Sequence, residues 1–323
     1  MESPPSDAIP AACPGMGSEQ AGKSSTCYGC PNQSACASGT AAGPDLDKVA
    51  IAEKLGAVGQ VVLVMANKGG CGKSTVAAQL AYQLAADDSQ EVGYLDVDLT
   101  GPSGPHLFSV ADEEVHQAQT GWQPVSARDN LAVMSIGFML PSRDDAIAWR
   151  GVRKTGLIKQ FLRDVDWGEH LDWLIVDCPP GTSDEHITVA QYLGGLPNVS
   201  VLLVTTPQEM ALLDVRKQVN FCHKAHLRVL GVVENMSVFV CPCCGHREQV
   251  FAPTTGGAQA MSAQLHVPLL GAIPLDPALM RACESGTALK DSASPAYGAV
   301  RALTARLQAA VAGGASLNGY GAP

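Results

Sequence analysis

The chain has 323 residues, 46% of them hydrophobic, which is enough for one large α/β domain with short appendages. Its 21 Lys and Arg against 31 Asp and Glu give a formal net charge of -10, and no basic stripe exists to neutralise phosphates, so a nucleic-acid partner such as duplex DNA is disfavoured. No apolar run approaches the roughly 18 residues of a membrane span, so we expect no membrane insertion either.

Residues 1–45 are rich in Pro, Gly, Ser and Ala and carry few large aliphatic side chains. Such a composition cannot build a packed core, so we expect a flexible N-terminal extension. Its first seven residues are acidic, and the first arginine of the chain is Arg128. Both features are atypical of a secretory signal or a mitochondrial presequence, and we therefore expect a cytosolic or nuclear protein.

Four of the 11 cysteines lie in this extension with the spacing C-x13-C-x2-C-x5-C, at Cys13, Cys27, Cys30 and Cys36. An odd number of cysteines without an export signal favours metal chemistry over a disulfide framework. Four thiolates suit either Zn²⁺ or an iron-sulfur cluster, and binding of either would order a segment that has no core. The spacing alone does not decide between the two.

From residue 46 the pattern changes to an amphipathic helix, 46–55, followed by short apolar runs that alternate with helical ones. This alternation predicts βαβ units and a doubly wound, mostly parallel sheet. A last helix, 299–312, would close a domain spanning 46–312, and 313–323 would be a frayed tail. The predicted strands are 61–66, 92–96, 131–136, 174–177, 199–204, 229–233 and 269–272.

A glycine-rich turn follows the first predicted strand and precedes a helical run, 76–86; it reads Asn67-Lys68-Gly69-Gly70-Cys71-Gly72-Lys73-Ser74-Thr75. Its backbone N–H groups and the helix N-terminus would hold phosphates, Lys73 would reach the terminal ones, and the Ser74 hydroxyl would bind Mg²⁺. Asn67 replaces the first glycine of the P-loop pattern, and Asn tolerates the left-handed backbone of such turns. Lys68 is the signature of the deviant K-G-G-x-G-K-[ST]-T form used by dimeric ATPases.

Carboxylates follow two of the predicted strands at their carboxyl ends, where an α/β sheet exposes its ligand crevice. Asp96 and Asp98 end one strand, and Asp177 ends another. We predict that Asp98 orients the attacking water and that Asp177 holds the hydration shell of Mg²⁺. With Lys68 and Lys73, these residues predict slow, Mg²⁺-dependent ATP hydrolysis.

ATP is preferred over GTP because the chain has no N-K-x-D guanine-reading motif, and Asn235 is the candidate adenine contact.

A second cysteine group, Cys241-Pro242-Cys243-Cys244-Gly245-His246, follows the strand predicted at 229–233. Two ligands from one loop make half of a four-sulfur site, and a two-fold-related copy would complete it. The alternative is a monomeric zinc knuckle that uses three cysteines and His246. We expect Cys241 and Cys244 to be the ligands, because a one-residue gap strains simultaneous ligation by Cys241 and Cys243.

Six motifs in order resemble the Mrp/MinD-type iron-sulfur scaffold ATPases, most closely their eukaryotic cytosolic nucleotide-binding protein 1 type. They are the N-terminal C-x13-C-x2-C-x5-C, K-G-G-x-G-K-S-T, D-V-D before G-P-S, V-D-C-P-P-G-T-S-D-E-H, E-N-M-S and C-P-x-C. The chain departs from that pattern at Asn67, at Cys71 in place of a usual valine, and at Cys243, which occupies the variable position of C-P-x-C.

The resemblance implies a scaffold that assembles [4Fe-4S] clusters and passes them to cytosolic and nuclear apoproteins. It implies a homodimer, or a hetero-oligomer with a related ATPase that lacks the N-terminal cysteines. By the same resemblance, the four N-terminal cysteines hold one stable cluster. Cys241 and Cys244 hold a second, labile cluster that bridges two subunits.

Two other classes share parts of this pattern. A positioning ATPase of the MinD or ParA kind needs a basic C-terminal helix or a basic face, and the last predicted helix has only Arg301 and Arg306. An electron-transfer ATPase like the nitrogenase iron protein also bridges a cluster between subunits, but its ligands are two well-separated cysteines. The motifs therefore favour the scaffold.

Overall fold

The computed structural model describes residues 20–28, 30, 33–37, 45–140, 151–181 and 183–313. Its internal contacts divide the chain into two units, 1–50 and 51–323. The first contains a short 3-10 helix, Ser25–Cys27, and α1 (Gln33–Ala37), and α2 (Leu46–Gly56) spans the boundary. Cys13 and residues 314–323 of the predicted tail lie outside the described residues.

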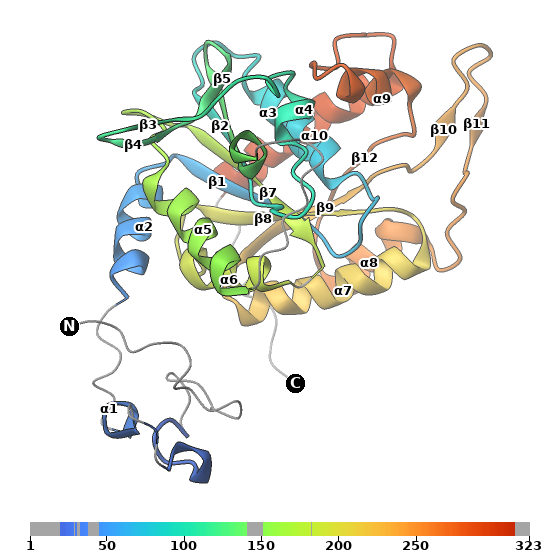
Figure 1. Ribbon diagram of the computed structural model, residues 1–323. Coiled ribbons are helices and arrows are strands. Elements are labelled where there is room, and N and C mark those ends of the chain that lie inside the picture. Colours follow the sequence, from blue (N-terminus) through green and yellow to red (C-terminus); the bar gives the residue numbers. More distant parts are fainter. Residues whose placement is uncertain are drawn as a thin grey trace. The chain divides into compact units, whose positions relative to one another are not determined.

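The second unit is built on an eight-stranded sheet with the order β12-β9-β8-β1-β7-β2-β6-β5 (Figure 1). Neighbouring strands run parallel from β12 to β6, and β5 pairs antiparallel with β6. This confirms the predicted doubly wound, mostly parallel fold. The strands are β1 (Gln60–Ala66), β2 (Val92–Asp96), β5 (Val125–Arg128), β6 (Leu131–Ser135), β7 (Trp173–Pro180), β8 (Val199–Thr205), β9 (Arg228–Glu234) and β12 (Leu269–Ala272).

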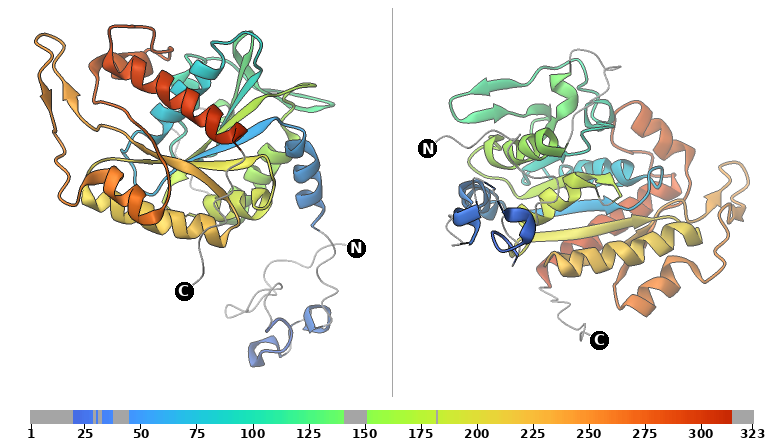
Figure 2. Two further views of the ribbon diagram at one scale, coloured as in Figure 1. Left: turned by 180° about the vertical axis from the view of Figure 1, so that it is seen from behind. Right: turned by 60° about the horizontal axis from the view of Figure 1, so that its bottom comes forward.

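Helices cover both faces of this sheet (Figures 1 and 2). One face carries α3 (Lys73–Leu84), α4 (Gly104–Leu107), α9 (Pro277–Glu284) and α10 (Pro295–Ala312). The other carries α5 (Gly151–Asp164), α6 (Asp184–Leu193), α7 (Glu209–Lys224) and α8 (Gly257–Leu265). A 3-10 turn, Ile136–Met139, follows β6. Within the described ranges, no helix combines the length and apolar character needed to cross a bilayer.

Two small hairpins stand outside the main sheet. One pairs β3 (His116–Ala118) with β4 (Gly121–Gln123), and the other pairs β10 (Phe239–Val240) with β11 (Arg247–Glu248). The second lies close to the C-P-x-C cysteines, because Cys241 directly follows β10. We call the stretch from Phe239 to Glu248 the cysteine hairpin.

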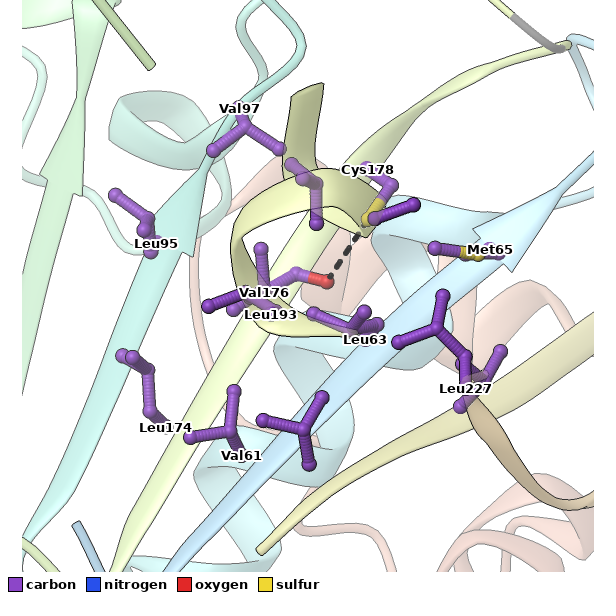
Figure 3. Close-up of a cluster of buried hydrophobic side chains, with 14 of the residues drawn as sticks. Val61, Leu63, Met65, Leu95, Val97, Leu174, Val176, Cys178, Leu193 and Leu227 are labelled. Carbon is purple, nitrogen blue, oxygen red and sulfur yellow. Dashed lines mark hydrogen bonds between the residues drawn. The ribbon is translucent and has the colours of Figure 1, made fainter. Parts of the chain in front are cut away.

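The apolar strands contribute side chains to two hydrophobic cores, one on each face of the sheet. Along β1, Leu63 and Met65 point into the core beneath α5–α8, whereas Val62 and Val64 point into the core beneath α3 and α10. Figure 3 shows Leu63 in the first core with its neighbours from β7, α6 and the chain before β9. Full burial of each such side chain contributes about 1.5–3 kcal/mol, so strands buried on both faces hold their register firmly.

That register brings the carboxyl ends of three strands together. Ala66 at the end of β1 pairs with Pro180 of β7, and Asp96 at the end of β2 pairs with Asp177 of β7. The glycine-rich turn after β1 and the two carboxylates therefore meet at one edge of the sheet.

Candidate nucleotide site and cysteine hairpin

The turn between β1 and α3 has the backbone of a phosphate-binding loop. Gly70 and Gly72 adopt left-handed φ values of 82° and 81°, which glycine alone adopts without strain. A Cβ on Gly72 would also lie 2.1 Å from Nδ2 of Asn235. Gly72 carries no side chain to cap α3, so the first N–H groups of this helix can bind an anion.

A cavity of about 210 Å³ opens in front of this loop. Its walls bring together the predicted loop residues 68–75, the carboxylate of Asp98 and Pro180 from the end of β7. Asp98 itself accepts hydrogen bonds from the Thr100 hydroxyl at 3.0 Å and from the Gly101 N–H at 3.2 Å. We call this hollow the phosphate cavity.

Lys73 is held at the phosphate cavity by two partners. Its ammonium donates to the Asp177 carboxylate and to Oγ of Ser74 at 3.1 Å, and the side chain is only 7% exposed. Burial by itself would lower the pKa of Lys73, but the neighbouring Asp177 carboxylate outweighs this effect and raises the pKa. Lys73 therefore stays charged, as a phosphate ligand needs to be.

Asp96 is a buried carboxylate to which the sequence analysis assigned no role. It accepts hydrogen bonds from the N–H groups of Ser103 and Gly104, both at 2.9 Å, and from the Ser135 hydroxyl at 3.2 Å. Burial, followed by the nearby Asp177 carboxylate, raises the pKa of Asp96 to about 7. Strand alternation gives no signal for this difference, because residues i and i+2 of a strand lie on the same face. The two carboxylates separate because β2 ends at Asp96 and Asp98 lies beyond it.

Lys68 lines the phosphate cavity but is paired with another element. Its ammonium lies 3.3 Å from Oδ2 of Asp214 on α7, and the Lys217 ammonium lies 3.1 Å from Oδ1 of the same carboxylate. The Lys68 side chain is 41% exposed. Two apolar side chains beside Asp214, Met210 and Leu213, are also exposed.

The two unusual residues of the loop have separate explanations. Left-handed backbone at non-glycine residues of the described chain occurs at Ser109, His226, Met236 and His266, and not at Asn67. The expectation that Asn67 is tolerated for its left-handed conformation is therefore wrong, because Gly70 and Gly72 make the turn. Cys71 is buried, its thiol donates to the Lys68 carbonyl at 2.9 Å, and burial raises its pKa.

A second hollow, of about 310 Å³, adjoins the loop at Gly70, Gly72 and Thr75. Asn235 lies in its wall and donates through Nδ2 to the Cys71 carbonyl at 2.9 Å, so this side chain also fixes the loop. The sequence analysis did not predict the opposite wall, which is formed by the segment before α9 and by α9 itself. We call this hollow the base-side cavity; that wall consists of Pro274, Leu275, Asp276, Leu279, Met280, Cys283 and Glu284.

The cysteine hairpin presents its thiols at a tight turn. The Cys241 N–H donates to the His246 carbonyl at 2.8 Å, and the Gly245 N–H donates to the Cys241 carbonyl at 2.9 Å. Hydrogen bonds from the backbone N–H groups of Cys244 and Cys243 lower the pKa of the Cys241 thiol. Such N–H contacts favour the thiolate that a metal requires, and both candidate second ligands lie beside Cys241.

The N-terminal cysteines are only partly described. Within the first unit the Cys30 N–H donates to the Cys27 carbonyl at 3.1 Å, so one turn carries both residues. Cys27 is buried, whereas Cys30 and Cys36 are partly exposed. Among the described residues, no three His, Cys, Asp or Glu side chains converge on a point that could hold a metal ion.

Known proteins share this architecture. The nucleotide-binding protein of Archaeoglobus fulgidus, solved with ADP and with Co found, is 35% identical over 75% of this chain and 93% of that chain, with a TM-score of 0.64. The cell division ATPase MinD of Pyrococcus furiosus is 25% identical over 78% and 99%, with a TM-score of 0.55. MinD of Pyrococcus horikoshii, solved with Mg-ADP, is 23% identical over 80% and 99%, with a TM-score of 0.54, and supports the fold alone.

The model of the NUBPL iron-transfer P-loop NTPase family, a ParA group, matches residues 57–308. This match extends from β1 to α10 and includes the phosphate loop, the carboxylates at the strand ends and the cysteine hairpin. The chain therefore belongs to the NUBPL iron-transfer P-loop NTPase family.

Proposed function

We propose that this protein is a scaffold ATPase that carries [4Fe-4S] clusters and transfers them to apoproteins of the cytosol and nucleus, in the manner of the nucleotide-binding protein 1 type. The observation that carries the proposal is that a phosphate loop and an exposed C-P-x-C turn belong to one domain, and that a short stretch of chain joins this turn to Asn235, whose side chain holds the Cys71 carbonyl of the loop. In this scheme the clusters are the cargo of the protein, and ATP binding and hydrolysis are coupled to their assembly and transfer.

The nucleotide part of the proposal follows from the phosphate cavity. Lys73 and the first N–H groups of α3 would hold the phosphates, and the Ser74 hydroxyl would bind Mg²⁺. Asp177 would hold water on that ion, and Asp98 would orient the attacking water. Mg²⁺ supplies charge neutralisation when it is bound. Lys68 would act on the nucleotide of a second copy, which makes hydrolysis slow in a single chain.

The cargo part rests on the two cysteine groups. Cys241 with Cys244 would supply two sulfur ligands, and a second copy or a related subunit without the N-terminal cysteines would supply two more. The hydrogen bonds at Cys241 fit a thiolate ligand. Cys13, Cys27, Cys30 and Cys36 would hold a separate cluster within one chain. No nucleic acid or membrane takes part in this scheme.

The structure disfavours a MinD-like positioning role that uses the last helix as an anchor. Val300, Leu303 and Leu307 of α10 are buried in the core, and the Arg306 guanidinium donates to the Leu270 carbonyl of β12 at 3.0 Å. A helix that packs on its own sheet in this way has no free apolar face to insert into a lipid surface.

Anaerobic purification followed by iron, sulfide and zinc analysis with EPR spectroscopy tests the proposal. We expect iron and sulfide in equal amounts and an EPR signal of a reduced [4Fe-4S] cluster. The paired variant Cys241→Ala, Cys244→Ala should lose the more labile part of the iron. Zinc without sulfide, or unchanged iron content and chelator kinetics in that double variant, would overturn the proposal.

A further inference from the structure

The stretch of chain that leaves the nucleotide site runs directly into the cysteine hairpin. Asn235, the residue directly after β9, holds the Cys71 carbonyl of the phosphate loop and lines the base-side cavity. The next residue, Met236, has a left-handed φ of 55°, which is uncommon for a residue with a side chain. The chain then enters β10 and reaches Cys241.

A second segment ties this stretch to the base-side cavity. The Leu275 N–H donates to the Val238 carbonyl at 2.9 Å. The Ser237 N–H and hydroxyl both donate to the Ile273 carbonyl, at 3.0 and 3.1 Å. Phe239 forms an isolated parallel bridge with Leu275. The wall of the cavity and the base of the hairpin are thus one hydrogen-bonded unit.

The same wall separates two hollows. On the far side of the base-side cavity lies a groove of about 430 Å³, lined by Phe239, Leu275, Pro277, Met280, Arg281 and Glu284. Leu275, Met280 and Glu284 line both hollows, whereas Phe239 lines the groove alone. A group that fills the base-side cavity therefore contacts a wall of three side chains, two of them apolar, that also lines the groove beside Phe239, the first residue of β10.

We propose that Leu275, Met280 and Phe239 form a coupling wall through which nucleotide binding restrains the cysteine hairpin. A nucleoside diphosphate in the base-side cavity fixes Leu275 and Met280, and through them Phe239 and the turn at Cys241. Because coupling between two sites is reciprocal, a metal ion held by the hairpin changes nucleotide affinity by the same factor. This inference rests on the proposed function, since it needs nucleotide in that cavity.

The test compares the rate at which each cysteine of the full, metal-free chain is alkylated in the presence and in the absence of Mg²⁺ and ADP. Peptide mass spectrometry follows each cysteine separately. We expect ADP to slow alkylation of Cys241 by about fivefold, the low end of typical coupling energies. Cys283 lines the base-side cavity and reports occupancy, whereas Cys30 belongs to the first unit and serves as an unaffected reference. An unchanged or faster rate at Cys241, with Cys283 protected, would overturn the inference.

Failure of the proposed function gives a different result, because Cys283 would then remain unprotected at saturating ADP. Phe239→Ala removes the hairpin side of the wall without touching the base-side cavity. We expect this variant to keep ADP protection of Cys283 and to lose the fivefold effect at Cys241, and Phe239→Leu to restore most of it. Leu213→Ala, an exposed leucine on α7 outside both hollows, should behave as the parent chain.

A reciprocal measurement keeps the inference testable if Phe239→Ala does not fold. Zn²⁺ alone, added to the parent chain, should change the Kd for ADP by about fivefold, and ADP should change the Kd for Zn²⁺ by the same factor. The change should persist in Cys27→Ala and vanish in Cys241→Ala. Equal ADP affinity with and without Zn²⁺, at a Zn²⁺ concentration that blocks alkylation of Cys241, would contradict the coupling wall.

Discussion

Lys68 and Lys73 lie on the same loop but are held by carboxylates of different elements. Lys73 is buried against Asp177 at the end of β7, whereas Lys68 is partly exposed and paired with Asp214 on α7. A buried cation with a fixed carboxylate suits permanent binding of phosphate. An exposed cation on a weak pair can exchange partners at little cost.

We expect Lys68→Ala to leave ATP binding within about twofold while it cuts hydrolysis by roughly 10²-fold or more, since a charge supplied in trans acts on the transition state. Lys73→Ala should weaken both. Equilibrium ATP binding and phosphate release measure the two quantities. Normal hydrolysis by Lys68→Ala in a sample confirmed as dimeric would remove the role in trans.

Asp214→Asn should raise hydrolysis at limiting protein concentration, because it releases Lys68 for the second copy. An exposed ion pair is worth about 0.2–1 kcal/mol, so the gain is at most about fivefold. Lys217→Ala is the matched control, since it removes the other cation from Asp214 and keeps the Lys68 pair. A gain of equal size in both variants would mean that loss of the Asp214–Lys217 pair, and not the release of Lys68, is responsible.

The raised pKa of Asp96, about 7, makes stability fall as pH rises. The folded chain binds a proton at Asp96 that the unfolded chain releases near pH 4, so the stabilisation is complete below pH 4 and lost through pH 7. His186, whose burial lowers its pKa to about 4, acts in the opposite direction between pH 4 and 6.5. The unfolding free energy of the parent chain, followed as a function of pH, therefore contains both contributions.

Comparison of the parent chain with Asp96→Asn isolates the contribution of the Asp96 carboxylate to the pH dependence of stability. The unfolding free energy of the variant minus that of the parent should increase with pH between 4 and 7, by roughly 1.4 kcal/mol per pH unit at most. Urea unfolding in a pH series provides the measurement. A difference that stays constant across this range would show that Asp96 ionises in the folded chain as it does in the unfolded one.

At the scale of elements, the junction of β1, the phosphate loop and α3 depends on backbone that only glycine supplies. Gly72→Ala would strain a left-handed φ and force Asn235 away from the loop. We expect it to cost about 1–3 kcal/mol of stability and to weaken ATP binding. Gly69→Ala, where an added Cβ meets nothing within 4 Å, should be nearly neutral in a thermal unfolding assay. Equal losses in the two variants would contradict this explanation.

The sequence predicts the central strands well because both faces of each strand are buried, so each strand appears in the sequence as a continuous apolar run. β2 and β12 have the predicted bounds, and β7 extends beyond the prediction because Pro180 pairs with Ala66 of β1 after an irregularity in the register. The antiparallel edge strand β5 was missed, since only Val125 among its residues is buried and no apolar run marks it. The α9 wall was missed because its proline-rich start resembles an ordinary turn in sequence.

For the candidate site as well, the sequence predicts what local motifs determine but not the contacts between distant elements. Spacing along one strand or one loop brings Lys73, Ser74 and Asp98 to one cavity, as their local motifs indicate. Asp214 pairs with Lys68 across more than half of the domain, and no local pattern links the two. Contacts of this kind depend on the packing of α7 against the sheet, which is a property of the folded chain.

At the scale of the whole molecule, the two cysteine groups should differ in how firmly they hold a cluster. The four N-terminal ligands come from one chain, so their cluster should survive dilution. The cysteine hairpin supplies half a coordination sphere, so its cluster should be lost as subunits separate. Chelator kinetics over a range of protein concentrations test this difference.

Cys241→Ala should abolish the concentration-dependent cluster and weaken the dimer, whereas Cys27→Ala should remove only the concentration-independent one. Cys244→Ala compared with Cys243→Ala then identifies the second hairpin ligand, and we expect it to be Cys244. Loss of both clusters in either single variant would show that the sites are not independent.

The two ends of the large sheet limit how chains can associate. β12 and β5 are four residues long, and each pairs with its neighbour through an irregular register. Short, irregular edges are poor templates for strand addition, so growth of the sheet into ribbons or fibres is blocked at both ends. In the proposed scheme, a second copy would associate through the loops at the carboxyl edge, and assembly would stop at a closed pair.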